Sequence, residues 1–103
     1  MWVLHTVESD GNELLTFRIM PDGMKTIGRA PTADFTLDRT LVSRLHCRLI
    51  STTDRLEVED LDSTNGTFVN DQKVRRKVLA SGDTLRLGRI ELRCLRNERP
   101  SSC

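Results

Sequence analysis

The chain contains the stretch Asp62-Ser63-Thr64-Asn65-Gly66-Thr67-Phe68-Val69-Asn70. It begins with small hydroxyl and amide side chains and passes through an Asn-Gly dipeptide. Asn-Gly is a strong turn signal, because both residues tolerate positive φ. Residues 56–60, just before the stretch, alternate apolar Leu56 and Val58 with acidic Glu57 and Glu59, which is typical of a half-buried strand. The stretch therefore predicts a tight connection between two β-strands.

Short strands separated by turn residues account for most of the chain. Turn signals at intervals of about 8 to 12 residues are typical of antiparallel sandwiches and barrels. The predicted strands are residues 2–7, 14–20, 25–28, 34–37, 47–52, 56–60, 67–69, 78–79, 84–87 and 91–96. The predicted turns are residues 10–12, 21–23, 31–33, 52–54, 65–66, 70–71 and 81–83. We expect an all-β sandwich in which each strand buries one face.

Residues 38–45 are polar and basic, lack a turn glycine and show no periodicity, so we expect a long functional loop there. This loop and two other connections carry the distinctive polar residues: Ile27-Gly28-Arg29, Val42-Ser43-Arg44-Leu45-His46 and residues 62–70. Together they offer one guanidinium group, two or three hydroxyls, a carboxamide and several backbone N–H groups. This combination suits an oxyanion such as a phosphate monoester, which carries about −1.5 to −2 charge. Turn caps and solvated charges are the alternative interpretation.

Composition limits the possible classes of protein. A chain of 103 residues fits one domain, which we place at residues 1–96, with 97–103 as a flexible tail or the start of a linker. No apolar run approaches the roughly 20 residues that span a bilayer, and no secretory signal is visible, so we expect an intracellular protein without membrane contact. The net charge of +1 provides no overall field for nucleic acid. Met1 fits a native start and an N-terminal domain of a longer protein.

Rival functions lack their required patterns. An enzyme would use Ser43 and His46 with Asp60 or Asp62, but the chain has no nucleophile elbow. A Cys47 phosphatase would need a phosphate-cradling loop after the cysteine, where the sequence predicts a strand. The cysteines Cys47, Cys94 and Cys103 show no disulfide spacing, so we expect free thiols. Together with His5 and His46 they lack metal-ligand spacing, so we expect no metal; we also expect no cofactor. A nucleic-acid module would need exposed stacking aromatics. We assign all four aromatics to the core: Trp2, Phe17, Phe35 and Phe68.

The ordered motifs resemble the forkhead-associated (FHA) domain family. They are Gly28-Arg29, Ser43-Arg44-x-His46, Ser63-x-Asn65-Gly66-Thr67 with Asn70, Gly82-Asp83 and Leu87-Gly88. Each piece alone is weak, but the set covers residues 28–88 in the family's order and intervals. The resemblance implies an FHA-type sandwich of about 11 strands whose loops at one end hold a phosphothreonine peptide. It also implies a protein-interaction module that is not an enzyme.

The resemblance assigns roles residue by residue. Arg29, Ser43, Arg44 and Thr64 are expected to bind the phosphate, with Arg44 acting through its backbone N–H. Asn65 is expected to bind the peptide backbone, and phosphothreonine is expected to bind more tightly than phosphoserine. Loop-supporting roles are expected for Gly28, His46, Gly66 and Thr67.

The resemblance also suggests partners. Leu41 is apolar where some family members carry arginine, which disfavours an acidic preference at the third residue after the phosphothreonine. Five basic residues are candidates for attracting acidic or multiply phosphorylated peptides: Arg39, Lys73, Arg75, Arg76 and Lys77. A solvated turn is the alternative interpretation of residues 75–77.

We expect recruitment of a host protein to a kinase-modified partner. A start beginning Met-Trp resembles FHA domains of nuclear DNA-damage-response adaptors, and a cytoplasmic or bacterial kinase-signalling scaffold is the alternative host. A self-association function is the second hypothesis, because Trp2, Thr6 and the first strand are expected at a sheet edge. The resemblance implies two routes to a homodimer: contact through the sandwich faces, or binding of a phosphothreonine in the tail of a partner copy.

Overall fold

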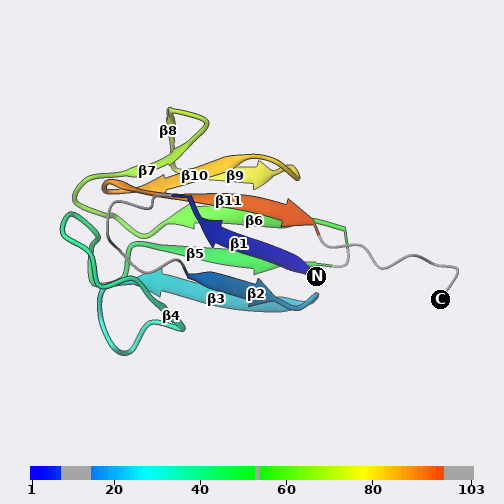
Figure 1. The fold of residues 1–103 in the computed structure, drawn as a ribbon, viewed down its shortest axis with the longest axis horizontal. Helices are drawn as coiled ribbons and strands as arrows, with labels where there is room; N and C mark the ends of the chain where they lie inside the picture. Colours follow the sequence, from blue (N-terminus) through cyan, green and yellow to red (C-terminus); the bar gives the residue numbers. More distant parts are fainter. Residues whose placement is uncertain (8–14, 53, 97–103) are drawn as a thin grey trace, which may run out of the picture.

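A computed structural model of the chain describes residues 1–7, 15–52 and 54–96. These residues form eleven strands and no helix, as the sequence predicts (Figure 1). The strands are β1 Trp2–Thr6, β2 Thr16–Ile19, β3 Gly23–Gly28, β4 Phe35–Thr36, β5 Cys47–Ser51, β6 Leu56–Asp60, β7 Thr67–Val69, β8 Gln72–Val74, β9 Arg76–Leu79, β10 Thr84–Leu87 and β11 Ile90–Arg96.

Two sheets pack face to face. One sheet has the order β2-β1-β11-β10-β7-β8, and the other has the order β4-β3-β5-β6-β9. The period-two pattern decides which side chains face inward: in β6, Leu56 and Val58 are fully buried, and in β10 so are Leu85 and Leu87. Further fully buried side chains fill the core between the sheets, including Leu4, Ile27, Leu49 and Leu92.

Three features of the strands differ from the sequence expectation. β8 was not predicted, because its first two residues, Gln72 and Lys73, are exposed at the edge of a sheet and give no apolar alternation. β4 pairs with β3 in parallel over two residues, whereas the sequence predicted an antiparallel sheet. β9 begins at Arg76 and not at Val78, so residues 76–77 are strand and not turn. Residues 75–77 are exposed to solvent, as the alternative of a solvated turn expected.

The first strand is not at an edge, contrary to expectation. β1 lies between β2 and β11 and pairs with both in antiparallel register. Trp2 is 3% exposed and Thr6 is 6% exposed, since both point between the sheets. The structural reason for expecting self-association through β1 is therefore absent.

The aromatic residues follow the prediction in three of four cases. Trp2 is buried, and Phe17 and Phe35 stack on each other with ring centroids 4.6 Å apart while packing against the core. Phe68 is outside the core cluster, and the guanidinium of Arg86 lies 4.5 Å from its ring centroid on the sheet surface. The assignment of Phe68 to the core is therefore wrong.

Several turns depend on backbone angles that most residues avoid. Predicted turns contain positive φ at Asp22, Gly66, Asn70, Asp71 and Gly82. Leu41 and Asp62 also have positive φ, at 77° and 57°, and neither was predicted. Both lie in the connections that carry the distinctive polar residues. The predicted turn at residues 10–12 and the predicted tail 97–103 lie outside the described residues.

Candidate functional site

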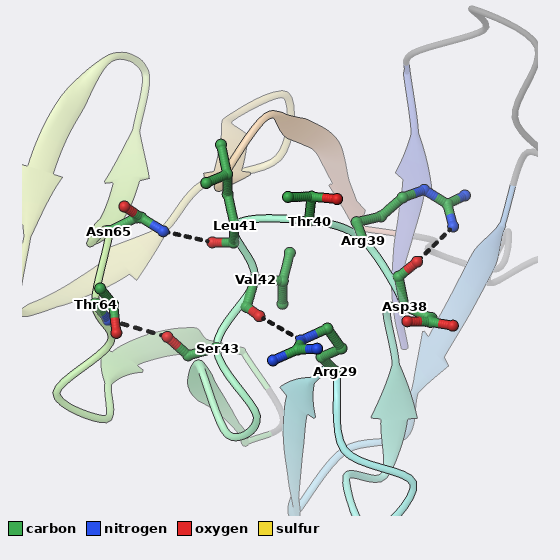
Figure 2. Close-up of a pocket in the computed structure, with 9 residues that line it drawn as sticks. All are labelled: Arg29, Asp38, Arg39, Thr40, Leu41, Val42, Ser43, Thr64 and Asn65. Carbon is green, nitrogen blue, oxygen red and sulfur yellow. Dashed lines mark hydrogen bonds between the residues drawn. The ribbon is translucent and has the colours of Figure 1, made fainter.

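The three predicted connections meet at one end of the sandwich. They follow β3, precede β5 and precede β7, and in Figure 1 they lie at the end opposite the β2–β3 turn. Between them is an open pocket of about 430 Å³, which we call the Arg29 pocket. Its lining, drawn in Figure 2, is Arg29, Asp38, Arg39, Thr40, Leu41, Val42, Ser43, Thr64 and Asn65. Four predicted binding residues from three connections therefore converge: Arg29, Ser43, Thr64 and Asn65.

Arg29 is held in place by the loop across from it. Its backbone N–H donates to the carbonyl of Ser43 at 2.9 Å, and its side-chain Nε donates to the carbonyl of Val42 at 3.2 Å (Figure 2). Val42 is itself 2% exposed, so the loop is anchored in the core at this point. The terminal Nη groups of Arg29 make no hydrogen bond to any described residue. The exposed end of the guanidinium is thus oriented and available to an anion.

Ser43 and Thr64 are joined by a hydrogen bond that directs the serine hydroxyl. The backbone N–H of Thr64 donates to Oγ of Ser43 at 3.0 Å. Because Oγ accepts this bond, its own proton is free to be donated to a ligand in the pocket. The hydroxyl of Thr64 is exposed and makes no bond to a described side chain or backbone group. Two hydroxyl donors therefore face the same pocket as Arg29.

Asn65 connects the two loops on the other side of the pocket. Its side-chain Nδ2 donates to the carbonyl of Leu41 at 3.0 Å, which leaves the side-chain oxygen as an exposed acceptor. An acceptor at the edge of a pocket can bind a backbone N–H of an extended peptide. The backbone of Gly88 lies close to Leu41, since an added Cβ at Gly88 would lie 2.9 Å from the Leu41 carbonyl oxygen.

Arg44 belongs to an adjoining hollow. This hollow has a volume of about 480 Å³ and is lined by Arg29, Ala30, Pro31, Thr36, Asp38 and Arg44; we call it the Pro31 hollow. The Arg44 carbonyl accepts the N–H of Ala30 at 3.0 Å, whereas its own N–H has no bond to a described residue. An added Cβ at Gly28 would lie 2.0 Å from the Arg44 carbonyl oxygen. Only glycine at position 28 allows this approach of the two connections.

His46 is fully buried beneath the pocket and connects two of its loops. The backbone N–H of Ser43 donates to Nδ1 at 3.0 Å, and Nε2 lies 2.8 Å from the carbonyl oxygen of Gly66. Since an N–H cannot accept and a carbonyl cannot donate, the ring carries its proton on Nε2. Both ring nitrogens bond to backbone, so neither can act as a base toward Ser43. This geometry does not support the rival catalytic arrangement.

Asp60 organises the 62–67 connection, and the sequence analysis missed this role. Its carboxylate accepts from the Ser63 hydroxyl, the Ser63 N–H and the Thr67 hydroxyl, the last at 2.7 Å. Burial tends to raise the pKa of Asp60, but the hydrogen bonds from Ser63 and Thr67 outweigh it and hold the pKa below its usual value. Ser63 Oγ in turn accepts the N–H of Gly66 at 3.0 Å. The spacing of Asp60, Ser63 and Thr67 was the available signal.

The other candidate chemistries have no geometric support. Cys47 is completely buried, and burial raises its thiol pKa, which opposes a nucleophilic role. In residues 1–7, 15–52 and 54–96, no three potential ligand side chains gather to hold a metal ion. The same residues contain no helix that could cross a membrane.

Among the other predicted cations, Arg39 lines the Arg29 pocket. None of the other four lines the pocket. They lie on or between two neighbouring strands of the chain: Lys73 on β8, Arg75 between β8 and β9, and Arg76 and Lys77 on β9. Arg76 donates to Glu57 at 2.9 Å, and Arg75 lies 3.5 Å from Asp62.

Comparison with known proteins supplies the family. The family model of the FHA domain matches residues 25–88. The chain belongs to the FHA domain family. An oxoglutarate dehydrogenase inhibitor of Corynebacterium jeikeium is 40% identical over 65 residues, which cover 63% of this chain and 45% of the inhibitor. The glycogen accumulation regulator GarA of Mycobacterium tuberculosis is 35% identical over 74 residues, covering 72% of this chain and 46% of GarA. The FHA chain thus spans less than half of either relative.

Solved FHA structures resemble the whole sandwich. The FHA domain of FhaA, crystallised with the intracellular domain of another protein, has a TM-score of 0.81 and 35% identity, covering 91% of this chain and 99% of that chain. A structure from a study of phosphothreonine-dependent FHA domain interactions has a TM-score of 0.82 and 34% identity, covering 95% of this chain and 98% of that chain. The expected FHA-type sandwich is therefore confirmed.

Proposed function

We propose that this FHA domain binds phosphothreonine peptides and recruits its host protein to kinase-modified partners. The convergence of Arg29, Ser43 and Thr64 on one pocket carries the proposal, because a phosphate monoester needs a cation and oriented donors together. A related solved structure concerns phosphothreonine-dependent FHA interactions, which supports the same ligand class. Arg29 and the two hydroxyls hold the phosphate together with the N–H of Arg44, and Asn65 accepts a peptide N–H.

The expected affinity is modest. About four or five charge-assisted hydrogen bonds contribute roughly 1.5 to 3 kcal/mol each. Ordering a flexible peptide opposes them, so a net binding free energy of about −7 to −9 kcal/mol remains, near the micromolar range. The methyl group of phosphothreonine adds on the order of 1 kcal/mol if it is buried, so the phosphoserine peptide is expected to bind less tightly.

Calorimetry with a phosphothreonine peptide tests the proposal. We expect Arg29→Ala to weaken binding by about 2 to 4 kcal/mol while the fold stays intact, because the side chain is exposed and outside the core. Loss of the hydrogen bond from Nε to the Val42 carbonyl lowers the melting temperature only slightly. Arg18→Ala is the matched control, since Arg18 is an exposed arginine of β2, at a sheet edge. Equal binding of the phosphorylated and unphosphorylated peptides, or an unchanged affinity of Arg29→Ala, would refute the assignment.

The host context follows the relatives. The reported curated relatives are a corynebacterial inhibitor and a mycobacterial regulator, and nothing among them supports a nuclear DNA-damage adaptor. We therefore favour the second host hypothesis, a kinase-signalling protein of a bacterial cell interior. A homodimer stays a proposal without support from β1, and the solution mass with and without kinase treatment tests it.

A further inference from the structure

The Arg29 pocket and the Pro31 hollow share two residues, Arg29 and Asp38. Arg29 therefore stands between a cavity that suits the phosphate and a second cavity of about 480 Å³. In Figure 2, Asp38 lies on the opposite side of Arg29 from Ser43 and Thr64. A peptide held by its phosphate in the first cavity thus has an open cavity beside it for a neighbouring side chain.

The carboxylate of Asp38 is the distinctive group of this second cavity. Asp38 is exposed, and its carboxylate accepts no hydrogen bond and forms no ion pair with any described residue. The nearby guanidinium of Arg39 donates to the backbone carbonyl of Asp38 and not to its carboxylate. A negative charge beside a phosphate pocket opposes phosphate binding. The Asp38 carboxylate therefore weakens binding of the phosphate unless it contacts another part of the ligand.

The charges of the lining residues and of the bound phosphate decide which side chain this cavity favours. Without a ligand, Arg29 and Arg44 outnumber Asp38 in the Pro31 hollow. A bound phosphate brings about −1.5 to −2 charge to Arg29 and the N–H of Arg44, which offsets the two arginines of the hollow. Arg39 donates to the backbone carbonyl of Asp38, so the Asp38 carboxylate is left without a counter-ion among these arginines. A cation is then favoured over an anion at Asp38. The lining of Ala30 and Pro31 also offers apolar surface for the methylene stem of a long basic side chain.

We infer that the Pro31 hollow is a second subsite of the peptide site, which takes a lysine or arginine close to the phosphothreonine through Asp38. The inference rests on the proposed function and specifies the class of phosphopeptide. Exposed ion pairs contribute little, so the expected preference is about threefold to fivefold and weakens as salt screens the charges. Binding of unphosphorylated peptides should show no such preference.

A peptide series with fluorescence anisotropy tests the subsite. The parent peptide has one phosphothreonine flanked by alanines. In the series, lysine or glutamate replaces one alanine at a time, at each position within about three residues of the phosphothreonine. Three residues of extended chain cover roughly 10 Å. We expect at least one position where lysine binds about threefold to fivefold more tightly than glutamate. Asp38→Asn should reduce this ratio below about twofold, and Asp38→Lys should reverse it.

Asp22→Asn is the matched control. Asp22 is an exposed carboxylate in the β2–β3 turn with positive φ, which asparagine tolerates, and the same charge is removed at the other end of the sandwich. Its lysine preference should equal that of the unaltered domain. The absence of any lysine preference, a glutamate preference, or a preference that persists in Asp38→Asn would overturn the subsite. The parent peptide separates the two proposals: if it binds no better than its unphosphorylated form, the phosphothreonine site itself fails.

Discussion

His46 shows how one side chain can hold two loops in register. The ring accepts from the Ser43 N–H and donates to the Gly66 carbonyl, so it fixes a connection from each side of the Arg29 pocket. It is completely buried, and water cannot replace these bonds without entering the core. The residue therefore supports the binding site without touching the pocket.

We predict that His46→Ala lowers both stability and peptide binding. The buried Gly66 carbonyl and the partly buried Ser43 N–H lose a partner and a cavity forms, which together cost about 2 to 4 kcal/mol. For a domain of this size, that loss lowers the melting temperature by at least about 8 °C. Thermal unfolding and calorimetry measure the two effects. The control is His5→Ala, because His5 is half-buried on β1 and makes one long contact of 3.4 Å to Thr16 Oγ1. A His46→Ala domain with an unchanged melting temperature but lost binding would contradict the supporting role.

Individual residues differed in how far the sequence could predict their place. Arg29, Ser43, Thr64 and Asn65 were predicted because guanidinium, hydroxyl and amide groups stood out in three connections and matched an ordered family pattern. Their convergence required the fold, since residues 29 and 64 are brought together only by the two sheets. The support from Asp60 was missed, because its spacing to Ser63 and Thr67 became meaningful only once the three hydrogen bonds were seen.

At the scale of elements, the glycines at the two ends of β3 differ in how closely other backbone atoms approach them. At Gly28 an added Cβ would meet the Arg44 carbonyl oxygen at 2.0 Å, whereas at Gly23 the nearest atom, the Met20 carbonyl oxygen, lies 3.3 Å away. Gly28 also accepts the N–H of Leu37 through its carbonyl at 2.8 Å. The end of β3 near the pocket is therefore the point where two connections pack backbone against backbone.

Gly28→Ala is expected to separate these connections. The overlap with the Arg44 backbone requires a shift of the loop, which we expect to cost more than about 2 kcal/mol of stability and to weaken peptide binding more than about tenfold. Gly23→Ala in the same strand should change the free energy of unfolding by less than about 1 kcal/mol. Chemical denaturation and calorimetry of the two variants make the comparison. Similar effects at both glycines would show that the close approach at Gly28 is unimportant.

The strands were predicted where alternation was clear and missed where it was absent. β6 and β10 place their leucines inward, and their predicted bounds match the structure. β8 is an edge strand with exposed Gln72 and Lys73, and it is formed by pairing with β7 after the turn at Asn70 and Asp71. Edge strands lack a second sheet neighbour, so they need little apolar pattern and leave little signal in a sequence.

At the scale of the whole molecule, the two buried thiols make the stability of the sandwich depend on pH. Cys47 is on β5 and Cys94 is on β11, so each sheet contributes one free thiol to the core. Burial raises the pKa of both, and that of Cys94 rises from 9.0 to about 12, with a smaller contribution from Asp83. The folded protein therefore keeps these thiols protonated at pH values where the unfolded chain ionises them.

We predict that stability falls from about pH 9 upward. Above the unfolded thiol pKa the unfolded state binds fewer protons than the folded state, so the free energy of unfolding declines by up to about 1.4 kcal/mol per pH unit for each thiol. The chain has no tyrosine, so no phenol titrates in this range. Urea unfolding between pH 8 and 10 measures how steeply the free energy of unfolding declines with pH. A Cys103→Ser background leaves Cys47 and Cys94 as the only thiols. Cys47→Ala and Cys94→Ala should each reduce the slope by about half, although each also lowers stability at pH 8 by opening space in the core. A slope that persists in the double variant would assign the alkaline loss to other groups, and the buried thiols would then have no part in it.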